Sequence, residues 1–329
     1  MKIRYLAFTE QGERLARRLA GRIGGEASRC GCPDGLQEWT QKAFAGADAL
    51  VYVGAAGIAV RAVAPFVQSK TEDPAVVVVD ECARFAVPIL SGHLGGANAL
   101  ARRIARAVGA QAVITTATDA NGVFAADEWA RLHNCAVVNP ERIKQVSGCL
   151  LSGGSVPLCS PWDFCGRPPQ GIEYPGPEGG IHVTVRRSRA EGLILVPRIL
   201  VLGIGCRRGI HAQTVERAFQ MLMKREGLYR EAVCAVASID LKRDEPGLLE
   251  FCARHGWPLQ TYSAQELEQT RGSFSGSEFV RDVTGVDNVC ERSAARCSNG
   301  ELLIKKTALD GVTLAVAQKP FEPDWRWTD

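Results

Sequence analysis

Four motifs that would point directly to a known chemistry are missing from this sequence of 329 residues. There is no G-x-x-x-x-G-K-[ST] and no G-x-S-x-G, which argues against nucleotide hydrolysis by a phosphate-binding loop and against a serine hydrolase. There is no H-E-x-x-H and the five histidines are far apart, so we expect no metal ion bound by the protein itself. No C-x-x-C occurs, and of the twelve cysteines only Cys30 and Cys32 lie close together, so we expect reduced cysteines that fill the core.

The sequence also lacks a strong net charge and a long apolar run. Its 39 basic and 36 acidic residues give a formal net charge of +3, which gives no support to nucleic-acid or membrane-surface binding. The longest apolar run, Ala49 to Val60, is shorter than the roughly 18 residues that cross a bilayer. The chain starts with a predicted strand and an amphipathic helix rather than a signal peptide. Together with the reduced cysteines, these features predict a cytoplasmic protein.

The most informative stretch of the sequence runs from residue 76 to residue 118. A β-branched run predicts a strand that ends at residue 79, and a second apolar run at 85–90 is followed by the glycine-rich turn SGHLGG at 91–96. Apolar residues at helical spacing then predict a helix from Ala97 to Val108, which Gly109 would end. A glycine loop at the start of a helix gathers unpaired backbone N–H groups and the positive end of the helix dipole, so it suits an anion.

Three residues of this stretch are candidates for catalysis on an anionic substrate. His93 lies in the glycine-rich turn, and its ordinary pKa near neutrality suits acid–base work. Glu81 and Asp119 follow predicted strands, where each could act as a second acid or base or orient the imidazole. His93 could instead be a loop histidine hydrogen-bonded to backbone, and this alternative stays open.

Strands and helices alternate along the chain, which predicts mainly parallel sheets covered by helices. Two strand–glycine–helix units precede residue 110, with glycine loops at 54–57 and 91–96 that are predicted to open at the same edge of the sheet. Six of the sixteen prolines lie between Pro157 and Pro177, and a third unit starts at Ile199. We therefore predict an amino-terminal α/β domain at 1–130, a small Pro/Gly-rich middle region at 131–197, a carboxy-terminal α/β domain at 198–319 and a loosely ordered tail at 320–329.

The third unit carries two adjacent arginines, Arg207 and Arg208, in a predicted glycine loop, and arginines beside free backbone N–H groups favour anion binding. The spacing Gly203-x-Gly205-x-x-x-Gly209 has one residue too many for a dinucleotide-binding fingerprint.

Further along this unit, Lys242 and Glu245 belong to a polar cluster at a strand end, which a solvated helix start would also explain. Glu291 is equally compatible with a helix cap.

Seven segments of the sequence together resemble a known family. The segments are VGAAGIAVRAVAPF at 53–66, DPAVVVVDE at 73–81, FAVPILSGHLGGAN at 85–98, VITTATDANG at 113–122, GIGCRRG at 203–209, SIDLKRDEPGLLE at 238–250 and NVCERSAA at 288–295. In this order they resemble the cobalt-precorrin-5A hydrolases of anaerobic cobalamin biosynthesis (the CbiG family). The resemblance covers nearly the whole chain, and the SGHLGGAN run is its most diagnostic part.

The resemblance implies a hydrolase that opens the δ-lactone of a cobalt-containing contracted tetrapyrrole, releases acetaldehyde and leaves cobalt-precorrin-5B. Cobalt would arrive inside the substrate, so no cofactor is expected. The expected partners are this anionic cobalt-tetrapyrrole, held between the two larger domains, and neighbouring enzymes of the cobalamin pathway. Backbone N–H groups of the 91–96 turn could hold an oxyanion beside the catalytic candidates. The residues expected to bind the substrate are Gly54, Gly57, Arg61, Ser91, Gly92, Gly95, Gly96, Asn98, Thr116, Gly205, Cys206, Arg207, Arg208, Lys242, Glu245 and Glu291.

Two functions from other classes remain open at this point. One is an NAD(P)-dependent oxidoreductase built on the Gly203 loop and on Asp240, which ends the next predicted strand. The other is a carrier that hands corrinoid intermediates between enzymes without changing them. Binding of a nicotinamide cofactor would favour the first, and tight binding without lactone opening would favour the second.

Overall fold

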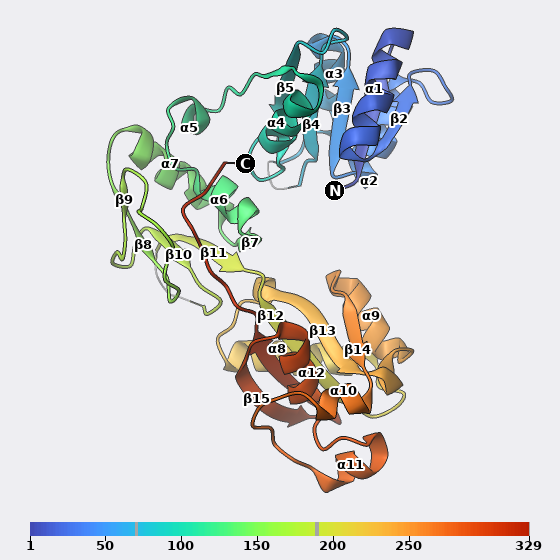
Figure 1. Ribbon diagram of the computed structural model, residues 1–329, viewed down its shortest axis with the longest axis vertical. Helices are drawn as coiled ribbons and strands as arrows, with labels where there is room; N and C mark the ends of the chain where they lie inside the picture. The colour runs from blue at the N-terminus through green and yellow to red at the C-terminus, as the bar shows by residue number, and fades with distance from the viewer. Residues whose placement is uncertain (70–71, 188–190, 329) are drawn as a thin grey trace.

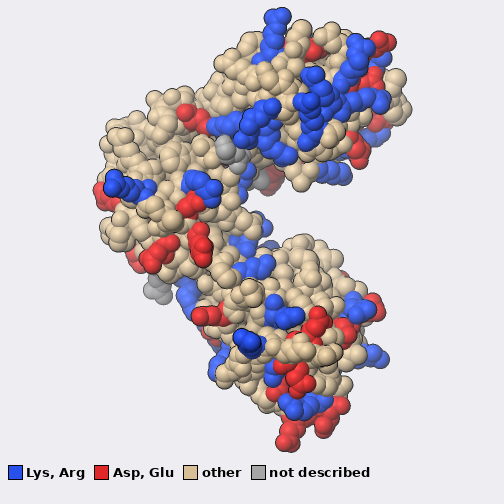
Figure 2. Space-filling model, viewed as in Figure 1, with Lys and Arg blue, Asp and Glu red and all other residues tan. Residues whose placement is uncertain are grey.

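The computed structural model describes residues 1–69, 72–187 and 191–328, which form three lobes arranged in an arc (Figure 1). The amino-terminal lobe contains a six-stranded sheet, and the middle region and the carboxy-terminal lobe each contain a five-stranded sheet. The surface is hollowed between the two outer lobes, and the middle region closes one side of the hollow (Figure 2). Mostly parallel sheets in two larger lobes and a smaller region between them confirm the predicted fold class. None of the helices in the described ranges is long and apolar enough to cross a membrane.

The amino-terminal lobe is a sheet with helices on both faces. In sheet order its strands are β2 (Glu26–Arg29), β1 (Ile3–Ala7), β3 (Ala49–Val53), β4 (Ala75–Val79), β5 (Phe85–Leu90) and β6 (Gln111–Ala112). The central strands β3 and β4 are buried along their whole length, which explains their unbroken apolar sequences. One face packs on α1 (Glu10–Ile23) and α4 (Ala97–Val108), and the other on α2 (Leu36–Gly46), α3 (Ala56–Val63) and the short η1 (Ala64–Phe66).

Strand β5 runs against its neighbour β4, which overturns the prediction that both glycine loops open at one edge. The link between the two strands is a tight turn in which Asp80 Oδ1 accepts hydrogen bonds from the N–H groups of Arg84 (2.8 Å) and Phe85 (2.6 Å). So short a link can join only antiparallel strands, because a parallel pair needs a crossover of about a dozen residues or more. The 91–96 turn after β5 therefore lies at the edge opposite Gly54.

The middle region has more regular structure than its sequence suggests. Its helices are α5 (Ala117–Ala120), α6 (Ala126–Leu132), η2 (Pro140–Arg142) and α7 (Ile143–Leu151). Its strands, in sheet order, are β7 (Cys135–Val137), β11 (Leu193–Pro197), β10 (Ile181–Val183), β8 (Val156–Cys159) and β9 (Ile172–Glu173). Phe124 and Trp129 are buried in the core of this region, so the border predicted at residue 130 falls inside a helix that belongs here.

The carboxy-terminal lobe has a second layered sheet. In sheet order its strands are β14 (Leu259–Tyr262), β13 (Val233–Ile239), β12 (Leu200–Cys206), β16 (Val312–Gln318) and β15 (Glu301–Leu309), of which β12, β13 and β14 are parallel. Its helices are α8 (Ala212–Arg225), η3 (Arg230–Ala232), η4 (Asp240–Lys242), α9 (Pro246–His255), α10 (Ala264–Glu268), α11 (Glu278–Thr284) and α12 (Cys290–Ser298).

The predicted glycine loop of this lobe is partly wrong, because Gly203 and Gly205 lie inside strand β12. A Cβ atom on Gly203 would stand 1.9 Å from the carbonyl oxygen of Cys290 at the start of α12. One on Gly205 would stand 2.5 Å from Thr313 Oγ1 on the neighbouring strand. These glycines therefore permit close packing, and only Gly209, with a φ of 74°, has the backbone conformation of a glycine turn.

The segment after β16 is packed against the protein, which contradicts the predicted loose tail. It leaves the carboxy-terminal lobe and runs back along the middle region towards the amino-terminal lobe (Figure 1). The Trp129 indole N–H donates to the Asp324 carbonyl oxygen (2.6 Å), and Trp325, 7% exposed, lies 4.3 Å from the Phe164 ring centre. Aromatic side chains bury a large apolar area, and this burial opposes the disorder expected of a chain terminus.

Candidate active site

The 91–96 turn leads from β5 into α4 and uses its own carbonyl groups to cap the helix. The carbonyl oxygens of Ser91 and Gly92 accept hydrogen bonds from the N–H groups of Ala97 (3.1 Å) and Asn98 (2.9 Å). The N–H of Gly96 donates to the carbonyl oxygen of His93 (2.8 Å). The predicted anion site at this helix start is therefore largely filled by the turn itself. Of the turn N–H groups expected to hold an oxyanion, those of Gly92 and Gly95 have no backbone hydrogen bond within the described part of the chain.

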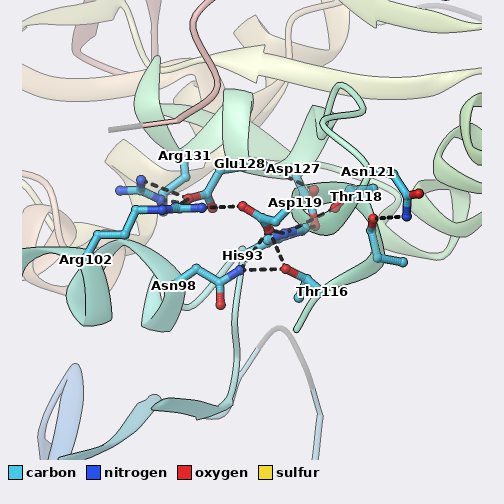
Figure 3. Close-up of polar contacts among 11 residues, drawn as sticks. His93, Asn98, Arg102, Thr116, Thr118, Asp119, Asn121, Asp127, Glu128 and Arg131 are labelled. Atoms are coloured by element: carbon cyan, nitrogen blue, oxygen red, sulfur yellow. Dashed lines mark hydrogen bonds and ion pairs between the residues drawn. The ribbon is translucent and has the colours of Figure 1, made fainter. Parts of the chain in front are cut away.

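His93 lies between two carboxylates at the junction of the amino-terminal lobe and the middle region (Figure 3). Its Nε2 is 2.9 Å from Asp119 Oδ2 and its Nδ1 is 3.1 Å from Asp127 Oδ2. The side chain of His93 is 14% exposed and those of both aspartates are 10% exposed. The structure thus brings together two of the three predicted catalytic residues, His93 and Asp119, and adds Asp127 of α6.

The surroundings of His93 keep its imidazole charged. Burial lowers the pKa of this histidine, but the hydrogen bonds to Asp119 and Asp127 and the charges of Asp127 and Glu128 more than offset that effect and raise the pKa to about 10. For Asp119, burial favours the neutral acid. The hydrogen bonds from His93, Thr116 and Arg102 outweigh it and hold the pKa of this carboxyl well below its usual range.

Further polar side chains surround His93, Asp119 and Asp127. The amide of Asn98 donates to Thr116 Oγ1 (3.0 Å) and to Asp119 Oδ2 (3.1 Å), and the Arg102 guanidinium pairs with Asp119. Glu128, with a side chain only 1% exposed, pairs with Arg131 (3.2 Å) and lies 3.9 Å from Arg102. Burial raises the pKa of Glu128, and Arg131 opposes this rise.

The cluster joins two lobes, since α4 and the 91–96 turn supply one half and α5 and α6 supply the other (Figure 3).

Glu81 does not belong to this cluster, and its predicted place beside His93 is wrong. It lies in the β4–β5 turn, where Thr9 Oγ1 donates to its Oε1 (2.8 Å). The carboxyl end of β3 carries the other candidates of this edge, Gly54, Gly57 and Arg61. Because β5 is antiparallel, the sheet separates these residues from His93. A Cβ atom on Gly54 would stand 2.7 Å from the Phe8 ring, so this glycine is needed for packing.

The remaining candidates of the amino-terminal lobe have partners within the protein. The hydroxyl of Ser91 donates to the carbonyl oxygen of Asp73 (2.9 Å). Thr116 Oγ1 donates to Asp119, and Asn98 is only 1% exposed. Gly95 has no room for a side chain, since its Cβ would stand 2.4 Å from Ser91 Cβ. These residues hold the turn and the cluster together.

The candidates of the carboxy-terminal lobe form a separate group. Arg207 and Arg208 are exposed after β12, next to the half-buried Cys206, whose thiol pKa is raised to about 11 by burial. The N–H of Gly209 donates to Glu245 Oε1 (2.8 Å). The other oxygen of Glu245 accepts from Lys242 Nζ (3.0 Å). The Glu245 carboxylate therefore accepts the hydrogen bond of the Gly209 N–H, a loop N–H group that was expected to bind a carboxylate of the substrate.

Glu291 is fully buried and acts inside the lobe. Its carboxylate accepts hydrogen bonds from the N–H (2.7 Å) and the hydroxyl (3.1 Å) of Ser275 and from the N–H of Lys306 (2.6 Å). Asn288 Oδ1 accepts from the N–H of Glu291 (2.9 Å), so the expected cap is made by Asn288 alone. The carboxylate of Glu291 fixes a loop and a strand and offers no exposed face to a ligand.

Sequence reasoning missed Asp127, Glu128 and Arg102. The signal that could have found the two acids is their position in FAADEWA at 124–130, where acidic residues stand among residues that are otherwise apolar. A buried acid needs a partner, so such a placement predicts an ion pair. Within the described ranges, no group of three or more His, Cys, Asp and Glu side chains is arranged to hold a metal ion.

Comparison with known proteins identifies the family. A family model described as "Cobalamin synthesis G N-terminal" matches residues 38–119, and one described as "Cobalamin synthesis G C-terminus" matches residues 200–317. The cobalt-precorrin-5A hydrolase of Salmonella typhimurium is 35% identical over 86% of this chain and 85% of its own length. That of Priestia megaterium is 30% identical over 83% of this chain and 79% of its own.

A solved structure of a cobalamin biosynthesis protein G homolog from Sulfolobus solfataricus covers 97% of both chains at 22% identity, with a TM-score of 0.42. The predicted resemblance is confirmed by the sequence matches, which extend over most of the chain and of both curated relatives. The chain belongs to the cobalt-precorrin-5A hydrolase family.

Proposed function

We propose that the protein is a cobalt-precorrin-5A hydrolase of cobalamin biosynthesis. It opens the δ-lactone of a cobalt-containing contracted tetrapyrrole and releases acetaldehyde, giving cobalt-precorrin-5B. The observation that carries this proposal is the 35% identity to the Salmonella typhimurium enzyme over 86% of the chain. The cobalt ion belongs to the substrate. The protein works in the cytoplasm, beside the enzymes that supply and consume these intermediates.

The substrate is a large polyanion, and its proposed place is the hollow between the two outer lobes (Figure 2). Its acetate and propionate groups need cationic partners at the surface. Arg207 and Arg208 in the carboxy-terminal lobe are both exposed, and arginine binds carboxylates with two parallel hydrogen bonds. These two arginines are the proposed substrate ligands.

The reaction needs a proton donor at two points. Water adds to the lactone carbonyl and its protons pass to solvent, while the bond from the carbonyl carbon to the ring oxygen breaks and that oxygen takes up a proton, which gives a carboxylate and an alcohol. The alcohol then loses its proton to solvent, the carbon–carbon bond to the macrocycle breaks, and acetaldehyde leaves. The electron pair of that bond stays on the macrocycle carbon, which takes up a proton. His93, held as a cation, is the proposed donor, and the N–H groups of Gly92 and Gly95 are the proposed support for the oxyanion.

Incubation of the purified protein with cobalt-precorrin-5A tests this function directly. We expect acetaldehyde, measured by its enzymatic reduction with consumption of NADH. The tetrapyrrole product should have a mass lower than that of the substrate by the mass of acetaldehyde minus the mass of water. The His93→Gln variant should be slower by about 100-fold, the usual contribution of a positioned acid or base. Tight binding of the substrate without acetaldehyde would overturn the hydrolase and indicate a carrier. A nicotinamide-dependent oxidoreductase gains no support, because Gly203 and Gly205 lie in strand β12 and not in a phosphate-binding turn.

A further inference from the structure

We propose that Asp127 is a positioning residue of the active site, which holds His93 as an imidazolium with both ring nitrogens protonated. The middle region thereby supplies an essential part of a site whose histidine comes from the amino-terminal lobe. The catalytic meaning of this inference rests on the proposed function, but the protonation of His93 can be tested without it.

The contacts of the two ring nitrogens of His93 determine its protonation state. Both lie within hydrogen-bonding distance of a carboxylate oxygen, at 2.9 Å from Asp119 and 3.1 Å from Asp127. An ionised carboxylate has no hydrogen to donate, so each contact is a hydrogen bond only if the ring nitrogen carries the hydrogen. A neutral imidazole would direct one nitrogen lone pair at a carboxylate lone pair. The geometry therefore requires the cation.

The positive charge of His93 depends more on Asp127 than on Asp119. Asp119 is also bonded by Arg102, Asn98 and Thr116, so its charge has a permanent cationic partner. Asp127 accepts only a backbone N–H, that of Glu128 (3.1 Å), besides His93. Among the described residues, His93 is the one side chain bonded to the Asp127 carboxylate. Loss of the His93 proton would leave Asp127, itself 7% exposed, as a buried charge without a counterion.

The other charged groups around the imidazole do not replace this pair. Glu128 of α6 is a further negative charge facing His93, which favours the cation as well. Its charge is shared by Arg131 on the same helix and by Arg102 on α4. Asp119 on α5 completes the set of ionisable groups around the ring. Among the residues that the structure describes, Asp127 is the member of this set whose one side-chain hydrogen bond is that to His93.

The charge of His93 decides which step of the reaction it can assist. An imidazolium with both nitrogens protonated can donate a proton or stabilise a developing negative charge, but it cannot take a proton from water. His93 is therefore the acid of the reaction. It has this role only while α6 is docked against the 91–96 turn, because Asp127 reaches it from the middle region.

Titration of the histidine ring signals by NMR tests the inference. The chain has five histidines, and the signals of His93 are those missing from the His93→Gln variant. In the wild type, the His93 signals should not titrate between pH 6 and 8.5. In Asp127→Asn, which keeps the shape and an acceptor oxygen but loses the charge, the midpoint should fall by about 2–3 pH units and enter this range. Asp127→Glu, which keeps the charge, should retain a high midpoint.

The matched control is Asp324→Asn, since Asp324 lies 3.2 Å from a different histidine, His133 at the end of α6, and no hydrogen bond or ion pair joins it to His93 among the described residues. It should leave the His93 signals unchanged. A wild-type His93 that titrates near pH 6.5, or an Asp127→Asn variant with the wild-type midpoint, overturns the inference. The wild-type titration alone is decisive if Asp127→Asn does not fold.

Kinetics with cobalt-precorrin-5A separate positioning from mere stability. Asp127→Asn should lower kcat at least tenfold with little change in KM, shift the pH profile to lower pH, and be partly rescued by Asp127→Glu. A folded Asp127→Asn variant with the wild-type kcat and pH profile overturns the positioning role. An inactive wild type with an unchanged NMR result would instead overturn the proposed function and leave the imidazolium assignment in place.

Discussion

His93→Gln should reduce the free energy of unfolding by an amount that depends on pH. The pKa of His93 is raised to about 10 in the folded protein, so folding binds the proton more tightly than the unfolded chain does. The stabilisation is fully present below the unfolded pKa of about 6.5 and is lost as the pH rises through the folded pKa. The difference in stability between wild type and variant should therefore be largest near pH 6 and smallest near pH 10.

The size of this difference follows from the two pKa values. A rise from 6.5 to about 10, at about 1.4 kcal/mol per unit, gives an upper value of about 5 kcal/mol. The lowered pKa of Asp119 describes partly the same ion pair, so its contribution is not added again. We expect about 3–5 kcal/mol at pH 6, falling by about 1 kcal/mol for each pH unit between 7 and 10.

Urea unfolding of both proteins at several pH values between 6 and 10 measures the difference. The probe is tryptophan fluorescence, to which the fully buried Trp129 close to the cluster contributes together with five other tryptophans. Lysine, tyrosine and cysteine titrate in both proteins and cancel in the comparison. His182→Gln is the control. Burial lowers the pKa of His182, and its Nε2 accepts from the Gly179 N–H (3.2 Å), so its contribution should be constant above pH 7. A His93→Gln difference that is also constant from pH 6 to 10 would refute the charged imidazole.

Three further predictions concern the rest of the chain. Gly203→Ala should destabilise the protein by about 1–3 kcal/mol in urea unfolding, because the new Cβ atom would stand 1.9 Å from a backbone carbonyl oxygen of α12. Gly148→Ala is the control: a Cβ atom there has open space in α7, so this variant should be slightly more stable than the wild type. Trp325→Ala should cost about 3–5 kcal/mol, because its ring is buried against the middle region, and an unchanged melting temperature would contradict the packed tail. Changing both Arg207 and Arg208 to Ala should weaken substrate binding by about 2–4 kcal/mol and leave the single-turnover rate nearly unchanged, while unchanged affinity would mean that this loop does not bind the substrate.

Local patterns in the sequence predicted much of the local structure. The helix predicted from Ala97 to Val108 has these bounds in the structure, and Gly109 ends it with a φ of 75°. The sequence Ser-Ala-Gln-Glu at 263–266 is a capping-box pattern, and the structure contains this capping box. Both features depend on residues close together in the chain, where side-chain spacing and backbone freedom decide the outcome.

Contacts between distant segments were harder to predict. The apolar run at 85–90 is compatible with a strand in either direction, and only the short link after β4 shows that β5 is antiparallel. The partner of His93 was equally hidden, because Asp127 lies 34 positions further along the chain and in another lobe. Periodicity shows which residues are buried, but it does not show which residues meet.

The glycine loops illustrate a second limit. The sequence shows where glycines leave backbone N–H groups accessible. It does not show whether these groups already donate hydrogen bonds to acceptors within the protein. Glu245 accepts a hydrogen bond from the N–H of Gly209, and carbonyl oxygens of the 91–96 turn accept hydrogen bonds from the first N–H groups of α4. A loop that looks like an anion site can therefore be a satisfied packing element.

The charges of the His93 cluster separate catalysis from substrate binding. Among the described residues, three acids, Asp119, Asp127 and Glu128, face three cations, His93, Arg102 and Arg131, so this set has no excess positive charge for a polyanionic substrate. The charge of the substrate must then be balanced by residues elsewhere, which is why the exposed arginines outside the cluster are the proposed ligands. The charges of this cluster instead keep His93 protonated at both ring nitrogens. Substitutions in the cluster should consequently change kcat and its pH dependence, whereas substitutions of the exposed arginines should change KM.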